Sequence, residues 1–297
     1  IIYLLMVFQY AHGAVYNIKI GYSDTLEITK EAYNLLCYGF EADHPSNHCT
    51  SEYIDSEMIW DALMANDVQA ALMSEEIILA NQKRAKQPII VLPFYQQYML
   101  LIGNNDLTLE NIQSFRDKTI GVTDWSSKEH RAKPLGLALG LKEHDVFFHI
   151  SSTREQLTDL FCGFALDGIM IMSNPSSTLA RELITSCDGK IQSFTDQQIQ
   201  KIQKSSLGFY PAIIPKETFW RVEEDVKTLR SRTFLVINPN KDVSRSILNS
   251  LDHVKDELNL ITLRTDMTPK SIIDTYDINP IKLHPLGQSF TKILVFY

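Results

Sequence analysis

Three clusters of small polar residues have the chemistry of an anion-binding site. They are Gly21–Thr25, Asp55–Ser56 and Ser126–Ser127, and each follows a strand-like run and opens a helix-like one. The first N–H groups of a helix lack intrahelical partners and lie at the positive end of the helix dipole, so they suit carboxylates. Each cluster alone is more simply a helix cap, but three of them in one chain favour capture of an anion or a zwitterion.

Motifs for catalysis are missing from the sequence. It contains no G-x-S-x-G, G-x-G-x-x-G, Walker A or H-E-x-x-H pattern, and no cysteine or paired carboxylate has a placed catalytic partner. The segment Glu41–Cys49 has metal-ligand residue types, but Pro45 prevents His44 and His48 from sharing one helix face. We therefore expect a polar loop there, and we expect no enzyme activity, no metal and no cofactor.

The elements that must position these clusters alternate between strands and helices. Strands are expected at residues 15–20, 69–73, 89–92, 98–102, 119–122, 146–150 and 168–172. Helices are expected at 56–66, 108–115, 126–139 and 243–258, and others are expected to begin near residues 24, 153 and 175. Thr153 and Gln156 have the spacing of a capping box. Alternation at this density predicts an α/β protein with largely parallel sheets.

Charge and length narrow the class of protein. The chain has 297 residues, with 28 basic and 36 acidic side chains and a formal net charge of −8. This balance excludes the concentrated basic face of a nucleic-acid-binding protein. No run of Lys or Arg exceeds two residues, which excludes a polybasic membrane anchor. The length favours two lobes over one.

Residues 1–14 predict export. They carry no Asp, Glu, Lys or Arg, and their apolar run from Ile1 to Phe8 is too short to span a bilayer. A short apolar run before small residues is typical of a secretory signal peptide, here with cleavage after Gly13 or Ala14. No initiator Met or basic segment precedes it, so we expect the sequence to start within the signal. The alternative is a buried first strand. The four cysteines agree with an oxidising compartment, and the residues alone allow three pairings.

Six segments, by their order and spacing, resemble the motifs of one family. They are Tyr16–Gly21, Asp55–Leu72, Leu109–Val122 with Ser127 after it, Asp167–Pro175, Tyr210–Phe219 and His284–Gly287. They are similar in turn to a first strand with its binding loop, a G-S-x-x-N…L-x-x-G-x-x-D-x-A pattern, an L-x-D-L-x-G-K-x-V segment before G-S-G, an I-D-A…G-x-P stretch, a Y…I-P-x-x-x-Y segment and a closing H-P-G-A. This order of motifs resembles the TAXI (TRAP-associated extracytoplasmic immunogenic) solute receptors of TRAP transporters.

The resemblance implies a two-lobed, type II periplasmic-binding-protein fold, in which each lobe is a mainly parallel sheet flanked by helices. Lobe one would comprise residues 15–96 and 207–297, and lobe two residues 97–206. The chain would cross between the lobes near Tyr95–Gln97 and near Gly208–Pro211. The implied function is that of a periplasmic solute receptor. It would capture a small organic anion or amino acid, glutamate-like or dicarboxylate, and would deliver this small-molecule solute to the membrane subunits of a TRAP transporter.

The resemblance also implies which residues bind the solute and which form disulfides. A subset of the family carries cysteine pairs at the positions of Cys37 with Cys49 and of Cys162 with Cys187, which predicts those two pairings. The residues expected to contact the solute are Tyr22, Ser23, Thr25, Ser56, Trp125, Ser126, Ser127, Ser173 and Asn174.

The chain departs from the family's pattern where glycines bring backbone close to the ligand. Asp55, Ser126 and Lys128 replace expected glycines, and Thr25–Glu27 replaces a glycine-rich turn. Side chains there narrow the approach to the backbone N–H groups, so either the ligand differs from the family's usual solutes or binding is lost. Two alternatives stay open: an ABC-type solute receptor, and an exported protein of this fold that binds host or envelope proteins. The missing nucleophile–base arrangement disfavours a hydrolase.

Overall fold

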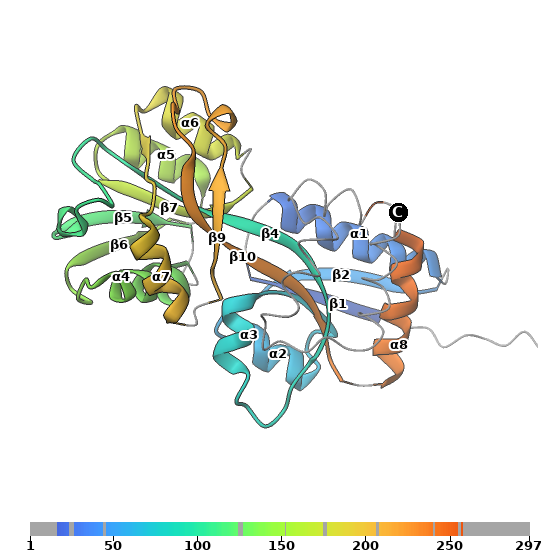
Figure 1. Cartoon of the computed structure of the whole chain (residues 1–297). Coiled ribbons are helices and arrows are strands. Elements are labelled where there is room, and N and C mark those ends of the chain that lie inside the picture. The colour runs from blue at the N-terminus through green and yellow to red at the C-terminus, as the bar shows by residue number, and fades with distance from the viewer. Residues whose placement is uncertain are drawn as a thin grey trace, which may run out of the picture.

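The computed structural model describes residues 17–23, 27–43, 46–123, 127–151, 153–174, 177–205, 208–239, 241–254 and 257. The expected signal segment, residues 1–14, lies outside these ranges, as do Thr25, His44, Trp125, Ser126, the side chain of Ser127 and the segment His284–Gly287. Within the described ranges the chain forms one mixed sheet with helices on both faces (Figure 1).

Ten strands make up this sheet in the described part of the chain. Eight of them follow the order β2 (His48–Tyr53), β1 (Asn17–Tyr22), β3 (Ala70–Ser74), β10 (Val226–Ile237), β4 (Ile89–Gly103), β7 (Gly168–Ser173), β5 (Lys118–Val122) and β6 (Val146–Ile150). The short strand β8 (Lys190–Ile191) pairs with β4, and β9 (Tyr210–Ile214) pairs with β10. Pairing is parallel among β1, β2 and β3 and among β5, β6 and β7, but it is antiparallel wherever β4 or β10 takes part. The expectation of largely parallel sheets is therefore correct at the two ends and wrong in the middle.

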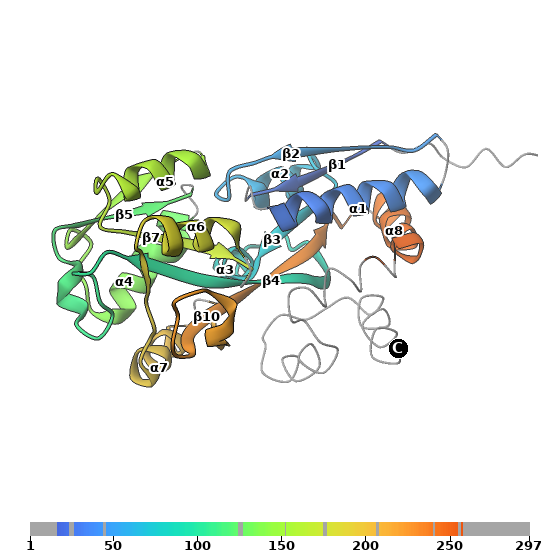
Figure 2. The same cartoon turned by 90° about the horizontal axis from the view of Figure 1, so that it is seen from above.

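The helices divide into two groups that match the two parallel ends. At one end, α1 (Glu27–Asp43) and α8 (Lys241–Ser250) enclose one core, and α2 (Ile59–Ala65) and α3 (Glu75–Asn81) enclose another. At the other end, α4 (Lys133–Leu139) and α7 (Asp196–Lys204) pack over one core, and α5 (Arg154–Cys162) and α6 (Thr178–Ser186) over the fourth. Figure 2 shows the long strands β4 and β10 running between the two groups. The chain thus has two lobes joined by a ribbon of two strands.

Strand β4 differs from the expectation of two short strands separated by Pro93. It is one continuous strand of 15 residues. Pro93 is accommodated because the register against β10 shifts there: Phe234 pairs with Pro93 and Thr233 with Tyr95, which leaves Phe94 as the extra residue of a bulge. A bulge tolerates a residue that cannot donate a ladder hydrogen bond.

Several expected helices are shorter or wound differently. Of residues 108–115, only Ile112–Phe115 form a 3₁₀ turn. Residues 127–132 are π-helical before α4, whose first turn contains Pro134, a residue that cannot donate a helical hydrogen bond. Thr153 caps α5 as expected, but the Gln156 side chain accepts from the Ser151 hydroxyl at 2.8 Å, so that capping box is only half formed. The expected helix over 243–258 becomes α8 followed by a 3₁₀ turn over residues 251–254.

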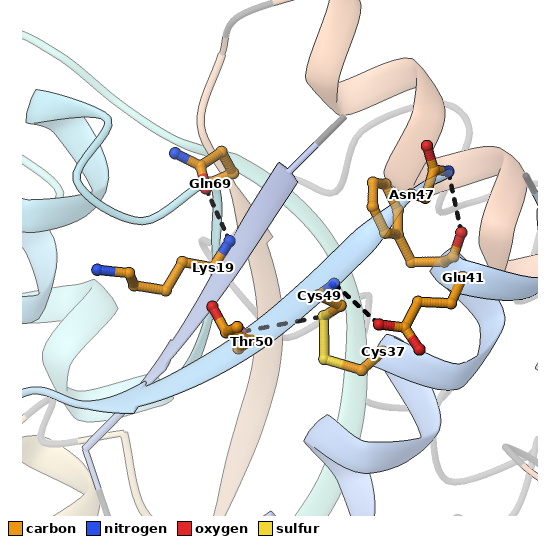
Figure 3. The surroundings of a disulfide bond; sticks show 8 residues. Lys19, Cys37, Glu41, Asn47, Cys49, Thr50 and Gln69 are labelled. Atoms are coloured by element: carbon orange, nitrogen blue, oxygen red, sulfur yellow. Dashed lines mark hydrogen bonds between the residues drawn. A yellow bond between two sulfur atoms is a disulfide. The ribbon is translucent and has the colours of Figure 1, made fainter. Parts of the chain in front are cut away.

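Both expected disulfides are confirmed. Cys37 of α1 is bonded to Cys49 of β2, and Cys162 of α5 is bonded to Cys187 after α6, with Cα atoms 5.1 and 4.9 Å apart. In Figure 3 the Glu41 carboxylate, one helical turn beyond Cys37, reaches the same strand and accepts the Cys49 backbone N–H at 3.0 Å. The first disulfide therefore fastens α1 to the edge strand of its lobe.

A helix able to cross a membrane, by its length and its apolar character, does not occur among the described residues.

The second crossing between the lobes packs differently from the expectation. Phe209 lies in the core under α4 and α7, and Ile214, Phe219 and Val226 lie in the core under α5 and α6. These residues were expected in lobe one, yet they pack against residues of 97–206. The reason is strand pairing, since β9 pairs with Val226–Arg230 of β10, and the Thr228 hydroxyl in this part of β10 donates to the backbone oxygen of Met99 in β4.

Candidate functional site

The strand register brings the carboxyl ends of both parallel groups to the middle of β4. Strand β3 ends at Ser74, which pairs with Thr233, and Thr233 pairs with Tyr95. Strand β7 ends at Ser173, which pairs with Tyr98. Tyr95 and Tyr98 are three residues apart, or about 10 Å along a strand. The two carboxyl edges therefore face each other across a short stretch of the ribbon, and it is outside such edges that α/β sheets bind ligands.

This part of the ribbon is polar on one face, although it is buried. Ser231 pairs with Gln97 and Thr233 with Tyr95, and directly opposed residues of an antiparallel pair share a face. All four side chains are at least nine-tenths buried. On either side of this polar stretch the ribbon is apolar: Leu235 belongs to the core under α1 and α8, and Leu229 to the core under α4 and α7. Burial of polar groups at the junction of the lobes marks a place where hydrogen-bonding partners are needed.

One buried ion pair links the two lobes beside the polar stretch. Arg131 lies in the π-helical segment Ser127–Ala132 after β5, and Glu76 lies in the first turn of α3 after β3. The Arg131 Nε donates to Glu76 Oε1 at 2.5 Å, and both side chains are 4% exposed. The other carboxylate oxygen, Glu76 Oε2, accepts from the Ser231 hydroxyl at 2.6 Å. A single carboxylate thus connects one element from each lobe with the ribbon between them.

A second buried ion pair anchors the neighbouring residue of α3. Arg232 donates through Nε and Nη2 to the two carboxylate oxygens of Glu75, each at 2.8 Å. The Tyr210 hydroxyl donates to Glu75 Oε1 at 2.6 Å and accepts from Arg232 Nη2 at 2.9 Å. Burial, and then the charge of Glu75, raise the pKa of Tyr210 well above its ordinary range. Burial alone would lower the pKa of Arg232, but its hydrogen bonds and attraction to Glu75 raise it instead.

Three buried hydroxyls have no hydrogen-bond partner within the described residues: those of Ser56, Ser74 and Thr233. Their side chains belong to residues only 2%, 4% and 1% exposed. Ser74 and Thr233 are directly opposed on β3 and β10, so their Cβ atoms lie about 4.5–5.5 Å apart. An unsatisfied buried hydroxyl costs about 1–3 kcal/mol, so two side by side call for a physical explanation.

The first turn of α1 lies over the same face as this pair of hydroxyls. Thr29, the third residue of α1, is 1% exposed, and its Oγ1 lies 2.5 Å from the Tyr95 hydroxyl oxygen. Tyr95 in turn pairs with Thr233, which pairs with Ser74. These four residues, Thr29, Ser74, Tyr95 and Thr233, are called the hydroxyl cluster below. They come from α1, β3, β4 and β10, four of the elements that build the core under α1 and α8, and they lie where that core reaches the polar stretch of the ribbon.

Four of the residues expected to bind solute lie at or next to the carboxyl ends of strands. Tyr22 is the last residue of β1. Its ring stacks on the ring of Tyr33, with the ring centres 4.9 Å apart, and meets the ring of Tyr53 edge-on, with the centres 5.9 Å apart. Ser23 follows β1 and is buried. Ser173 ends β7 and is also buried, and Asn174 follows it.

Ser56 does not act as a simple helix cap, and Ser127 lies at the start of a π-helical segment. Helix α2 begins only at Ile59, and Asp55 forms the turn before it: its Oδ1 accepts the Glu57 N–H at 3.1 Å and its backbone oxygen accepts the Ile59 N–H at 2.9 Å. Ser56 is therefore buried without a capping role, which corrects the expectation of a helix starting there. Ser127 opens a π-helical segment in place of an α-helix.

The hydroxyl cluster and both ion pairs were not predicted from the sequence. The signal was present in Arg230–Thr233, four consecutive polar residues between Leu229 and the apolar run Phe234–Ile237 of the same strand. It could be read only with the register, because the same residues would suit an exposed strand.

Two cavities lie away from the junction of the lobes, and the described residues form no metal-binding cluster. A cavity of about 240 Å³ lies under α4 and is lined by residues such as Leu137 and Phe148, and one of about 920 Å³ is lined by Asp188, Arg221 and their neighbours. Neither touches the junction of the lobes. Across the described ranges, no three His, Cys, Asp or Glu residues are grouped so as to hold a metal ion. Cys49, once considered as a ligand, is used in a disulfide.

Comparisons with known proteins agree with this architecture. The NMT1-like family matches residues 56–273. The regulatory domain of MetR, a LysR family regulator from N. meningitidis, superposes with a TM-score of 0.51 at 11% identity and covers 84% of this chain and 94% of that one. The alkanesulfonate-binding protein SsuA from Xanthomonas axonopodis pv. citri, bound to MOPS, superposes with a TM-score of 0.50 at 12% identity and covers 94% of this chain and 85% of that one. An ancestral arginine-binding protein bound to arginine superposes with a TM-score of 0.49 at 11% identity and covers 84% of this chain and 97% of that one.

At these identities the structural likeness shows the fold alone. The likeness to the alkanesulfonate-binding protein and the sheet topology confirm the two-lobed type II periplasmic-binding-protein fold. A search of curated protein sequences finds no match.

Proposed function

The chain belongs to the NMT1-like family, and from this premise we propose that it is an extracytoplasmic solute receptor without catalysis of its own. It captures a small organic anion or an amino acid between its lobes. The observation that carries this proposal is the register: both parallel groups of strands end at the same stretch of the ribbon, between Tyr95 and Tyr98. Ligand held there contacts both lobes at once, and it favours the closed arrangement by its differential affinity.

We propose the lobe boundaries with one change from the sequence expectation. Lobe one begins with residues 15–96 and lobe two begins at residue 97, as the resemblance implied, but lobe two extends past residue 206. The return crossing is placed inside β10, between Leu229 and Thr233, because residues from Phe209 to Leu229 pack in the cores of lobe two. The rest of the chain, from Thr233 to residue 297, then belongs to lobe one.

The residues proposed to contact the solute are those implied by the family motifs. Their described members support the assignment by lying at carboxyl ends of strands from both lobes, with Tyr22 and Ser23 from lobe one and Ser173 and Asn174 from lobe two. The remaining proposed contacts are Thr25, Ser56, Trp125, Ser126 and Ser127.

The proposed cellular role is that of a TAXI receptor serving the membrane subunits of a TRAP transporter in the periplasm. Two disulfides support an oxidising compartment, since cytosolic proteins rarely keep them. The proposal of a TRAP-type partner, in place of an ABC-type one, rests on the motif resemblance. The membrane subunits encoded by neighbouring genes decide between the two partners.

Thermal unfolding of the purified chain with a panel of the twenty amino acids, dicarboxylates and sulfonates tests the function. A solute at 100 times its Kd adds about 2.7 kcal/mol to the free energy of unfolding. For 297 residues, with an unfolding entropy of about 2.1 cal/mol/K per residue, this raises Tm by about 4 °C. Recovery of the solute unchanged supports a receptor. Recovery of a converted product would overturn the proposal in favour of an enzyme.

A further inference from the structure

The hydroxyl cluster has two properties of a ligand subsite that ordinary packing does not require. Ser74 and Thr233 are nine-tenths buried or more and opposed to each other, and neither hydroxyl has a hydrogen-bond partner among the described residues. They lie on the face of the sheet covered by the first turn of α1, a helix of 17 residues. The positive dipole end of such a helix favours a negative group.

The two buried arginines nearby are already engaged with carboxylates. Arg131 holds Glu76, and Arg232 holds Glu75 through two parallel hydrogen bonds. Each buried cation is thus balanced by a buried anion, and each of these carboxylates is also hydrogen-bonded by a hydroxyl, from Ser231 or Tyr210. A solute anion at this junction is therefore met by hydroxyl and backbone donors in preference to these two guanidinium groups.

We infer that Thr29, Ser74, Tyr95 and Thr233 form the subsite that binds the carboxylate of the solute at the first turn of α1. The inference rests on the proposed function and deepens it, since it names the group recognised and the residues that recognise it. The two unpartnered hydroxyls donate to the carboxylate oxygens, and the Thr29–Tyr95 hydrogen bond fixes the edge of the subsite. Hydrogen bonds to a charged group in a closed site are short and strong, which makes this pair of hydroxyls a large part of the affinity.

The inference predicts opposite effects on stability and on binding. Thr233→Val keeps the side-chain shape and removes a buried hydroxyl that no described residue satisfies, so the ligand-free variant unfolds about 2–5 °C above the parent. The same variant loses one charge-assisted hydrogen bond to the carboxylate, which weakens binding about 10–150-fold. Ser74→Ala follows the same pattern, and Thr233→Ser, which restores the hydroxyl, keeps the affinity within about threefold.

Thr228 on the same strand is the matched control. It is 1% exposed like Thr233, but its hydroxyl donates to the backbone oxygen of Met99. Thr228→Val therefore strands a buried acceptor, lowers Tm by about 2–5 °C and leaves solute binding unchanged.

The test is calorimetry and thermal unfolding of the parent and its four variants, with the twenty L-amino acids and succinate as probes. Weakened binding in Thr233→Val and Ser74→Ala, with Thr233→Ser and Thr228→Val unaffected, supports the subsite. Parent-like affinity in both hydroxyl-deleted variants overturns the subsite and leaves the receptor function standing. A Thr233→Val variant as destabilised as Thr228→Val also overturns it, because its hydroxyl would then be structural. A parent that binds none of the probes overturns the receptor proposal, and the subsite with it.

Discussion

Replacing Arg131 by Met is the sharpest test of how the two lobes are held together. The change leaves the Glu76 carboxylate buried at 4% exposure, with Ser231 still donating to it but its charge partner gone. Loss of one partner from a buried ion pair costs about 3–5 kcal/mol, because the remaining charge is uncompensated. With an unfolding entropy of about 0.6 kcal/mol/K for 297 residues, Tm falls by about 5–8 °C.

The double variant Arg131→Met with Glu76→Met separates the ion pair from the general effect of mutation. Both charges are then removed, so most of the loss is recovered, and the cost that remains is about 1 kcal/mol for the Ser231 hydroxyl, which loses its acceptor. A double-mutant cycle in urea measures the coupling directly. Lys19→Met is the exposed control: its partner is Glu52, the side chains are 43% and 50% exposed, and the expected cost is below about 1 kcal/mol.

Two outcomes would refute this reasoning. One is an Arg131→Met variant that melts within about 2 °C of the parent, which would mean that water or another group replaces the guanidinium. The other is a double variant no more stable than the single one, which would place the cost in packing and not in the stranded charge.

Three further predictions concern the cross-links and the pH dependence of stability. Removing the disulfide between Cys37 and Cys49, whose positions are 12 residues apart, costs about 3 kcal/mol in the free energy of unfolding by loop entropy, measured in urea against the intact parent. The folded-state pKa of Tyr210 is raised above its ordinary 10.0, so its contribution to stability is present below about pH 10 and is lost as pH rises beyond that. The Tyr210→Phe variant should therefore lose less stability than the parent between about pH 9 and 11. An unchanged slope of the free energy of unfolding against pH would contradict this. Burial alone would raise the pKa of Asp167, but hydrogen bonds from the Thr119 N–H and from Lys118 lower it. The contribution of Asp167 to stability is therefore present above its unfolded-state pKa and is lost as pH falls through the lower folded-state value. Asp167→Asn should flatten the fall of Tm at acid pH.

The parts of the fold that depend on local patterns were predictable from the sequence. Strand–helix alternation identified the parallel strands at both ends of the sheet, and the resemblance identified the cysteine pairs. The ribbon was not predictable in the same way. Pro93 predicted a break, and the bulge that removes the break depends on Phe234, a residue far along the chain.

The candidate site was likewise predictable only where local patterns or family motifs mark its residues. Tyr22 and Ser23 were proposed because their polar cluster follows a strand-like run, and Ser173 was proposed from the family resemblance; the structure places all three at or next to the ends of strands. Ser74 and Thr233 could not be found, because a hydroxyl in a strand has no meaning for ligand binding until its cross-strand partner is known. Their pairing joins positions separated by most of the chain, and no local periodicity encodes it.

The position of β10 also determines when the protein can fold. This strand lies between β3 and β4, and its residues Leu235 and Phe234 belong to the two cores of the first lobe. Neither core is complete until β10 has been synthesised, and the core under α1 and α8 also needs Ile247 and Leu251, although most of the lobe's own elements precede residue 90. Contacts at such sequence separation close large loops, so folding is slow and the two lobes form as one cooperative unit. A chain truncated before Val226 would leave β3 and β4 as unpaired edges, and we expect it to aggregate and not to yield a folded half.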